Sequence, residues 1–546
     1  MYARVKKSGP HQYLQIVETY RESKKVRQRV ITTLGRMDQL NGKGGVEPLI
    51  RSLSRFSEKA MLIFSGKSDL TANARKIGPA IICERLWQEL GIKGIIKEIL
   101  QERKFGFDVE RAVFMTVVHR LFASGSDRAC DKWRRDYKIS GIDDISLHHL
   151  YRAMSFLGEE IPDRKDATPF YPRCVKDVVE EKMFSSRRDL FSSLDLVFFD
   201  TTSLYFEGEG GETLGQKGYN KDHRPDLNQM VVGAVIDDRG KPICCEMWPG
   251  NTTDITTVLP VVKRLKHRFR INDFCLVADR GMISEKNMRE LESPSTGINY
   301  ILGARMRKVN EIKHDVLGRA GRFHEVYPEG FKSNDPAPLK VKEVRLNGKR
   351  YIVCLNTKQA RRDVADRQSI LEDLEQRVKT APKNMIGNKG YRKYLKITRG
   401  SVSIDYEKIK AEERFDGIWV LLTNTSLPAA QVALKYKELW QVEHLFRDLK
   451  SILETRPVFH QTNENIIGHV FCSFLALTLR KELDRRLLQA GCNFEWADIK
   501  QDLKSLQEII IEDNGVRLAV HSKSLGVCGK VFQAVGVSIP PTIREL

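Results

Sequence analysis

The sequence has no Cys-x-x-Cys pair, no long apolar run and fewer acidic than basic residues. Its ten cysteines are scattered, which excludes a zinc-ribbon spacing and favours reduced, mostly buried thiols. No apolar stretch approaches the ~18 residues of a membrane-spanning helix. The nearest one, residues 470–479, predicts a buried core helix. Without a signal peptide or a membrane span, the sequence favours a cytoplasmic protein with no membrane partner.

The charge balance is strongly basic. Lys and Arg number 91 against 71 Asp and Glu, a net charge of +20 at pH 7. The first fifty residues alone hold ten basic and four acidic side chains. Such a balance favours a polyanionic partner, nucleic acid above all, over a merely basic soluble protein.

A chain of 546 residues is too long for one core, and its patterns change along its length. Alternating residues at 12–20 and 27–35 predict a basic β-ribbon, either an arm on DNA phosphates or a solvated hairpin. Helical periodicity follows, with a basic stretch, "DKWRRDYK", that either meets DNA or faces solvent. We therefore expect five parts: a basic β-ribbon arm (1–45), a helical domain that is a candidate for DNA binding (46–190), the first part of an α/β core (191–305), a β-rich insertion (306–425) and the second part of the core with C-terminal helices (426–546).

The core segments predict an α/β fold. Two apolar runs joined at 237–240 indicate a hairpin, a helix is expected over 254–269, and Asn347-Gly348 marks another hairpin in the insertion. The strands read as consecutive apolar residues rather than alternating ones. That pattern is typical of a mixed sheet covered by helices on both faces.

Two apolar runs end in an acid. "LVFFDTT" runs into Asp200, and "CLVADRG" runs into Asp279. Because ligand sites in α/β sheets lie at the ends of strands, we expect these two carboxylates to share a site.

A third carboxylate lies in "YKELWQVEHLFRDLK", residues 436–450. At about 100° per residue, Glu443 falls at the border of an apolar stripe rather than on the open polar face. The stripe comprises Leu439, Val442, Phe446, Leu449 and Leu453, and the polar face comprises Lys437, Gln441, His444 and Asp448. The alternative is an ordinary surface ion pair between Glu443 and Arg447.

Three converging carboxylates repel one another unless hard cations lie between them. Mg²⁺ prefers oxygen ligands and keeps open positions for water and phosphate. Two such ions, ~3.5–4 Å apart, can activate an attacking oxygen and stabilise a leaving one at phosphorus. A basic protein with this acidic pocket suits phosphodiester chemistry.

At these residues the chain resembles the bacterial insertion-sequence DDE transposases of the IS4 group, and most of all the IS1634 family. The resemblance covers essentially the whole chain. Its carriers are "FFDTTSLYFEG", "GYNKDHRPDLNQMVVGAV", "GNTTDITTVLP", "LVADRGM" and "YKELWQVEHLFRDLK". It implies an RNase H-like core with Asp200, Asp279 and Glu443 as catalytic residues and metal ligands. It also implies two Mg²⁺ ions, for which Mn²⁺ can substitute.

The resemblance also implies DNA-binding residues. The group's helix signature is matched at Tyr436, Glu443 and Lys450, while Leu439 stands where the signature has Arg. Its expected DNA contacts are Tyr436, Lys450, Arg447, Arg280, His223 and Arg224. In the insertion, Tyr391 and Tyr394 are candidates for stacking on a base.

The reaction implied is hydrolysis at transposon ends followed by attack of the freed 3′-OH on target DNA. The partner is double-stranded DNA, with a homodimer in the synaptic complex, at the bacterial nucleoid. Three alternatives remain: a nuclease that cuts without joining, a non-catalytic DNA-binding descendant, and a haloacid-dehalogenase-like phosphatase. The last needs an Asp at the position of Thr202.

Overall fold

The structure of the chain, a computed structural model, describes residues 2–22, 25–42, 45–46, 50, 71–161, 173–187, 196–219, 224–282, 284–327, 339–380, 389–398, 401–513 and 516–546. It forms two compact units. The smaller unit comprises residues 1–75, 505–524 and 539–546, and the larger unit comprises 76–504 and 525–538. Among the described residues, no helix is long and apolar enough to cross a membrane.

The smaller unit contains the predicted basic β-ribbon. Its strands β1 (Tyr2–Ser8), β2 (His11–Glu22) and β3 (Lys25–Arg36) pair antiparallel, and the short helix α1 (Met37–Gly42) follows. The second strand is anchored by the buried side chains of Leu14 and Val17. Most of the other side chains described in the ribbon are exposed, Lys6, Lys7 and Arg27 among them.

A second sheet in this part of the chain was not expected. Its order is β18-β17-β16-β4, comprising β18 (Ile543–Glu545), β17 (Val516–His521), β16 (Gln507–Asp513) and β4 (Thr71–Lys76). We predicted C-terminal helices and did not identify these strands from the sequence. The sequence does carry a strand signal there: three consecutive isoleucines, 509–511, precede the hairpin pair Asn514-Gly515.

The described residues between 78 and 187 in the larger unit are mainly helical, while the expectation that this region binds DNA stays a prediction. Its helices are α3 (Gly78–Glu89), α4 (Ile92–Leu100), α5 (Val109–Phe122), α6 (Asp127–Trp133), α7 (Leu147–Gly158) and α8 (Val175–Arg187). Helices α5 and α7 pack against α16 (Asn463–Gln489), which contains the predicted core helix 470–479. Helices α17 (Trp496–Ser505) and α18 (Cys528–Val535) complete this region.

The centre of the larger unit is a nine-stranded mixed sheet of order β10-β11-β12-β15-β9-β8-β5-β6-β7. Its strands are β5 (Leu196–Tyr205), β6 (Gln229–Asp237), β7 (Pro242–Pro249), β8 (Cys275–Ala278), β9 (Asn299–Gly303), β10 (His324–Val326), β11 (Leu339–Leu346), β12 (Lys349–Asn356) and β15 (Ile418–Thr423). Strands β5, β6 and β7 are antiparallel, whereas β8 and β9 run parallel to β5. The predicted mixed sheet is therefore confirmed.

The segment expected as an insertion contributes β10, β11 and β12 to this same sheet. It also carries α11 (Thr357–Thr380), α12 (Lys389–Arg392), α13 (Tyr406–Glu413) and the small hairpin of β13 (Leu395–Thr398) and β14 (Ser401–Ile404). Both predicted hairpins are present. Asn347 and Gly348 have φ of 49° and 75°, the left-handed pair that a tight type I′ turn requires.

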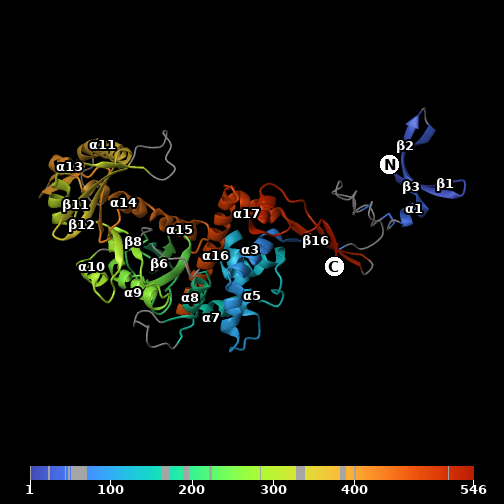
Figure 1. The fold of residues 1–546 in the computed structure, drawn as a ribbon, viewed down its shortest axis with the longest axis horizontal. Helices are drawn as coiled ribbons and strands as arrows, with labels where there is room; N and C mark the ends of the chain where they lie inside the picture. Colours follow the sequence, from blue (N-terminus) through green and yellow to red (C-terminus); the bar gives the residue numbers. More distant parts are fainter. Residues whose placement is uncertain are drawn as a thin grey trace. The chain divides into compact units, whose positions relative to one another are not determined.

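Helices lie on both sides of the sheet. Figure 1 shows α9 (Asp254–His267) below strands β6 and β8, α10 (Glu285–Glu292) to their left, and α14 (Ala429–Lys437) and α15 (Trp440–Ser451) above them. Helix α15 packs on β5 and β6, and α14 on β8 and β9. This covering explains why the strands are apolar on both faces.

Candidate active site

The strand register brings the first two predicted acids together. In the parallel pair β5–β8, Phe199 lies opposite Ala278, so the next residue on each side is a predicted acid, Asp200 within β5 and Asp279 directly after β8. Residues paired across a sheet share a face. Both side chains are partly exposed at the point where the fully buried strand residues end. The expectation that the two carboxylates meet is supported by this register.

The position of Asp200 within its strand differs from the prediction. Asp279 follows the last residue of β8, as expected, but β5 continues five residues beyond Asp200 to Tyr205. The polar residues after Asp200 look like a strand end in the sequence. Thr201, Thr202 and Ser203 are nevertheless buried, because hydroxyl groups can be accommodated in a sheet by hydrogen bonding.

Tyr436 contacts Asp279 and is influenced by the charge of Glu443, the third predicted acid. Its hydroxyl donates a hydrogen bond to Asp279 Oδ1 at 3.2 Å. Burial, together with the negative charges of Asp279 and Glu443, raises the pKa of Tyr436, so the phenol stays protonated. The ring lies over Gly303, where an added Cβ would come within 2.3 Å of the hydroxyl oxygen. A glycine at the end of β9 thus makes room for this contact.

Glu443 itself is exposed, on the first turn of α15. Arg447 is also exposed, and the two form no ion pair in the described part of the chain. The surface-pair alternative is therefore not what the structure contains. Leu439 is buried with the apolar stripe, as predicted, so it cannot replace the arginine of the helix signature.

One residue of the expected polar face is misplaced. Asp448 is 3% exposed, and its carboxylate lies 3.3 Å from Nη1 of Arg480 on α16 and 3.3 Å from Nδ1 of His444. The prediction of an open face at Asp448 was wrong because Arg480 of α16, which lies 32 residues further along the chain, covers it. A single helix pattern contains no information about such a partner.

The remaining predicted DNA contacts are dispersed. Arg280 is exposed directly after Asp279, and Lys450 is partly exposed on the last turn of α15. Arg224 forms an ion pair with Asp226 at 2.8 Å and lies over the ring of Tyr205. His223 lies outside the described residues.

A basic cavity begins at the loop after Asp279. Its volume is about 730 Å³, and six of its lining residues are Lys or Arg against one Glu. They are Arg280, Arg305, Arg307, Lys308, Lys393, Lys408 and Glu412, with Gly281 and Met306 between them. Arg307 pairs with Glu412 at 2.8 Å, which leaves a net excess of five positive charges.

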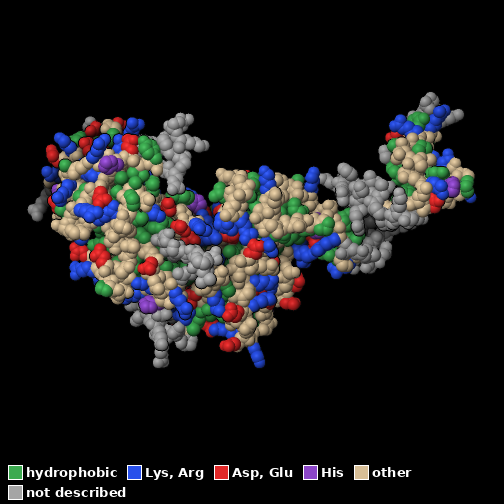
Figure 2. Space-filling view, in the orientation of Figure 1, with side chains coloured by type: hydrophobic (Ala, Val, Ile, Leu, Met, Phe, Trp, Pro, Cys, Tyr) green, Lys and Arg blue, Asp and Glu red, His purple; other side chains and the backbone are tan. Residues whose placement is uncertain are grey.

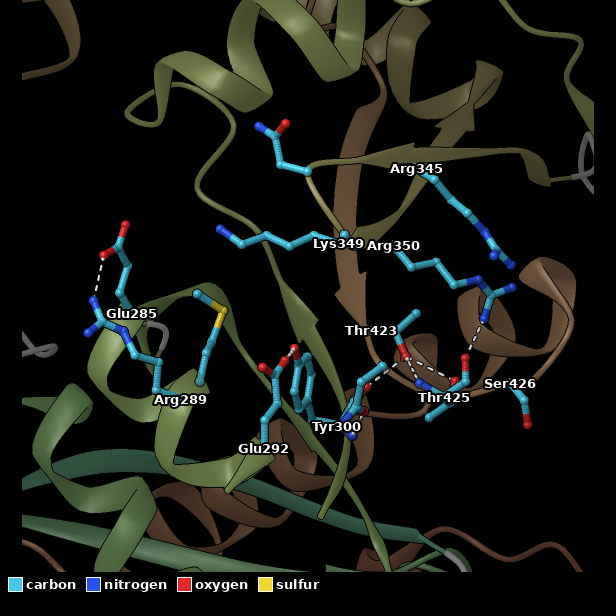
Figure 3. Close-up of a pocket in the computed structure, with 14 residues that line it drawn as sticks. Glu285, Arg289, Glu292, Tyr300, Arg345, Lys349, Arg350, Thr423, Thr425 and Ser426 are labelled. Carbon is cyan, nitrogen blue, oxygen red and sulfur yellow. Dashed lines mark hydrogen bonds and ion pairs between the residues drawn. The ribbon is translucent and has the colours of Figure 1, made fainter. Parts of the chain in front are cut away.

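Another cavity, of about 790 Å³, lies at the opposite end of the sheet, beside the start of β9 and the β11–β12 turn. Figure 3 shows Glu285 paired with Arg289 and Arg350 donating to the Thr425 carbonyl. Arg345 and Lys349 form ion pairs with Glu343 and Glu311, which are not among the residues drawn. Tyr300 donates to Glu292 at 2.5 Å at its floor. None of the three predicted acids lines this cavity.

The two tyrosines proposed for base stacking both pack against other side chains of the same segment. Tyr394 is buried in a small apolar cluster with Leu374 and Ile409, so its ring is not available at the surface. Tyr391 packs against that cluster and donates to Asp373. The expectation for Tyr394 was wrong, because basic neighbours in the sequence do not reveal a buried ring.

A second polar cluster, away from the sheet, consists of Asp127, His460 and His469. Such a trio could hold a metal, but its atoms already have protein partners. His460 lies 3.1 Å from Asp127, and His469 accepts from Arg120 and donates to the Thr455 carbonyl. Because the Arg120 guanidinium occupies the centre of the cluster, a structural role fits better than a cation site.

The family follows from a comparison with protein-family models. The model described as "Transposase DDE domain" matches residues 192–479, more than half of the chain. The model described as "IS1634 family transposase, N-terminal domain" matches residues 3–67. This chain is an IS1634-type DDE transposase. The resemblance stated from the motifs is confirmed, and with it the enzyme class, a polynucleotidyl transferase and endonuclease.

No curated protein matches the transposase. Among solved structures, it is similar to the piggyBac transposase in a structure titled "Cryo-EM structure of piggyBac transposase synaptic complex with hairpin DNA (SNHP)". The identity is 12% and the TM-score 0.37, over 78% of this chain and 79% of that chain. DDE transposases work with divalent metal ions, and the three predicted carboxylates are candidate ligands for such ions.

Proposed function

We propose that this transposase hydrolyses a phosphodiester at each transposon end and joins the freed 3′-OH to target DNA, using Asp200, Asp279 and Glu443 as Mg²⁺ ligands. The observation that carries the proposal is the β5–β8 register, which makes Asp200 and Asp279 neighbours. Tyr436 adds support because its hydroxyl donates to Asp279 and because the negative charge of Glu443 contributes to raising the pKa of Tyr436.

The donors present fit a hard divalent cation. All three are carboxylates, two of them on neighbouring strands of a rigid sheet, and their mutual repulsion is relieved by cations. When bound, two Mg²⁺ ions would polarise the scissile phosphate and favour ionisation of the attacking hydroxyl or water. The role of the three carboxylates would be to hold the cations at a fixed place on the sheet.

We also infer that the core is RNase H-like. The support is the strand sequence β7-β6-β5-β8-β9, in which three antiparallel strands are followed by two parallel ones. In chain order, Asp200 lies on the first of these strands, β5, and Asp279 directly follows the fourth, β8. Glu443 lies on α15, which packs on β5.

Double-stranded DNA is the proposed partner. The basic cavity next to Asp279 provides a path for a phosphate backbone toward the acids, and Arg280 belongs to it. Arg447, Lys450, Arg224 and His223 remain proposed DNA contacts, whereas the hydroxyl of Tyr436, also expected to contact DNA, is engaged by Asp279. Figure 2 shows Lys and Arg side chains spread over the visible face, in keeping with contacts from several elements. Two ends must be synapsed, so we propose a homodimer on DNA, acting at the bacterial nucleoid.

The test is an assay of end cleavage and strand transfer in Mg²⁺ with Asp200→Asn and Asp279→Asn. Each variant keeps its size but loses a metal ligand, so both steps should fall by ~10³-fold or more, about 4 kcal/mol of barrier. The matched control is Asp273→Asn, an exposed acid before β8, which should behave as the parent. Parent-like cleavage by either variant would contradict the assignment, and cleavage without any joining would favour a nuclease.

A further inference from the structure

The loop that follows Asp279 is held by side chains at three successive carbonyl groups. Arg305 donates through Nε to the Arg280 carbonyl at 2.9 Å and through Nη2 to the Gly281 carbonyl at 2.8 Å. Asn287 donates through Nδ2 to the Met282 carbonyl at 3.1 Å. The loop is also closed on itself by a bond from the Met282 amide to the Asp279 carbonyl at 3.1 Å. In a surface loop, these carbonyl groups would ordinarily accept hydrogen bonds from water.

Asn287 connects this loop to the start of α9. Its side chain, on α10, is 5% exposed, and the same amide nitrogen donates to the Ile255 carbonyl at 2.7 Å. An amide nitrogen has two hydrogens, so both are used. Asn287 therefore fixes the distance between the loop after Asp279 and the first turn of α9.

The residue before Ile255 continues the connection to β5. Thr201 donates its hydroxyl to Asp254 Oδ1 at 2.6 Å, and Thr201 is 1% exposed. The other oxygen, Oδ2, lies 3.4 Å from the point where a Cβ on Gly281 would stand, so the carboxylate also rests against the loop. Thr201 and Asp200 are consecutive in a strand, so their side chains point to opposite faces. Asp254 thus acts from behind the sheet.

We propose that Asn287 and Asp254 are positioning residues that set the separation of the two catalytic aspartates. The connection runs from the loop of Asp279 through Asn287 to the first turn of α9, and from Asp254 through Thr201 to Asp200. This inference rests on the proposed function. Two adjacent carboxylates repel each other in the absence of cations, so a rigid mount keeps them at the separation that the ions require.

The consequence is a weaker metal site when the connection is broken. Residues that orient metal ligands typically contribute about 10- to 100-fold to metal affinity. Asn287→Ala removes both donated bonds, and Thr201→Val removes the hydroxyl while keeping the shape of the side chain. Asp254→Ala removes the acceptor, whereas Asp254→Asn retains an oxygen that can accept from Thr201. Asn272→Ala and Asp273→Asn, exposed before β8, are matched controls.

The experiment is a titration of the full-length transposase with Mn²⁺, in which free Mn²⁺ is measured by electron paramagnetic resonance. Thermal melting and binding to transposon-end DNA are measured on the same samples. We expect Asn287→Ala, Thr201→Val and Asp254→Ala to raise the Mn²⁺ dissociation constant by about tenfold or more, with end binding retained. Asp254→Asn and both controls should stay close to the parent.

Parent-like Mn²⁺ affinity in both Asn287→Ala and Thr201→Val would overturn the proposal. Loss of affinity in Asp254→Asn equal to that in Asp254→Ala would also overturn it, because Asp254 would then act through its charge. If Asn287→Ala fails to fold, Thr201→Val decides alone. Asp200→Asn distinguishes failure of the positioning proposal from failure of the proposed metal site. Unchanged Mn²⁺ binding in that variant would contradict the metal site itself, whatever the positioning variants show.

Discussion

Tyr436 is the residue whose surroundings differ most from its expected role. The helix signature implies a contact with an end phosphate, but here its hydroxyl donates to Asp279. Because burial and the nearby acids raise the pKa of Tyr436, it remains a donor at any working pH. A protonated phenol beside a carboxylate holds that carboxylate in one orientation.

We therefore expect Tyr436→Phe to act on the chemical step. A hydrogen bond to a charged group contributes about 1.5–3 kcal/mol, so single-turnover cleavage should slow by roughly 10- to 100-fold. Binding to transposon ends, measured by gel shift, should change little. A variant that binds ends more weakly but cleaves bound DNA at the parent rate would instead indicate a phosphate contact.

At the scale of elements, buried histidines lie both in the helical region and on α16, which packs against it. His119 on α5 packs its ring on Trp133, and His469 on α16 accepts from Arg120. Burial and the Arg120 charge lower the pKa of His119 to about 4 and that of His469 well below its usual value. Both are therefore neutral in the folded protein at pH 7.

This neutrality makes the fold sensitive to acid. Unfolded histidine binds a proton near pH 6.5, whereas folded His119 does so only near pH 4. Stability is thus fully present above pH 6.5 and is lost as pH falls from 6.5 to 4, by up to about 1.4 kcal/mol per unit for each such histidine. His119→Gln should flatten the curve of unfolding free energy against pH in that window. Curves parallel to the parent's would contradict this reading, and His148→Gln, exposed on α7, is the control.

The same scale shows why part of the fold could be predicted and part could not. Periodicity, Gly-containing turns and apolar runs identified the helices 78–187, the hairpin at Asn347-Gly348 and the strands of Asp200 and Asp279, because these signals are local. The burial of Asp448 by Arg480 and the burial of Tyr394 depend on partners from other elements. Asp254 lies in a motif quoted for the resemblance, yet only the structure reveals its bond to Thr201.

At the scale of the whole molecule, the net charge of +20 favours DNA binding spread over several parts. We expect end affinity to fall steeply with salt, with log K decreasing by roughly 0.9 for each phosphate contacted per unit of log salt. Deleting residues 1–40, the basic β-ribbon, should weaken end binding and reduce this slope, while Mn²⁺ binding by the larger unit persists. Unchanged affinity and slope after the deletion would exclude the ribbon from DNA binding.

We propose that three carboxylates from two strands and a helix form one metal site. A substitution of Glu443 tests this proposal most directly. The place of Glu443 in the trio rests on the motif and on its charge at Tyr436. The measurement is the rate of transposon-end cleavage by Glu443→Gln in Mg²⁺, with Glu438→Gln as the matched control five residues earlier. We predict that Glu443→Gln binds ends as the parent does but cleaves ~10³-fold more slowly or not at all. Cleavage at a rate close to the parent's would contradict the claim, and the third ligand would then have to be another residue.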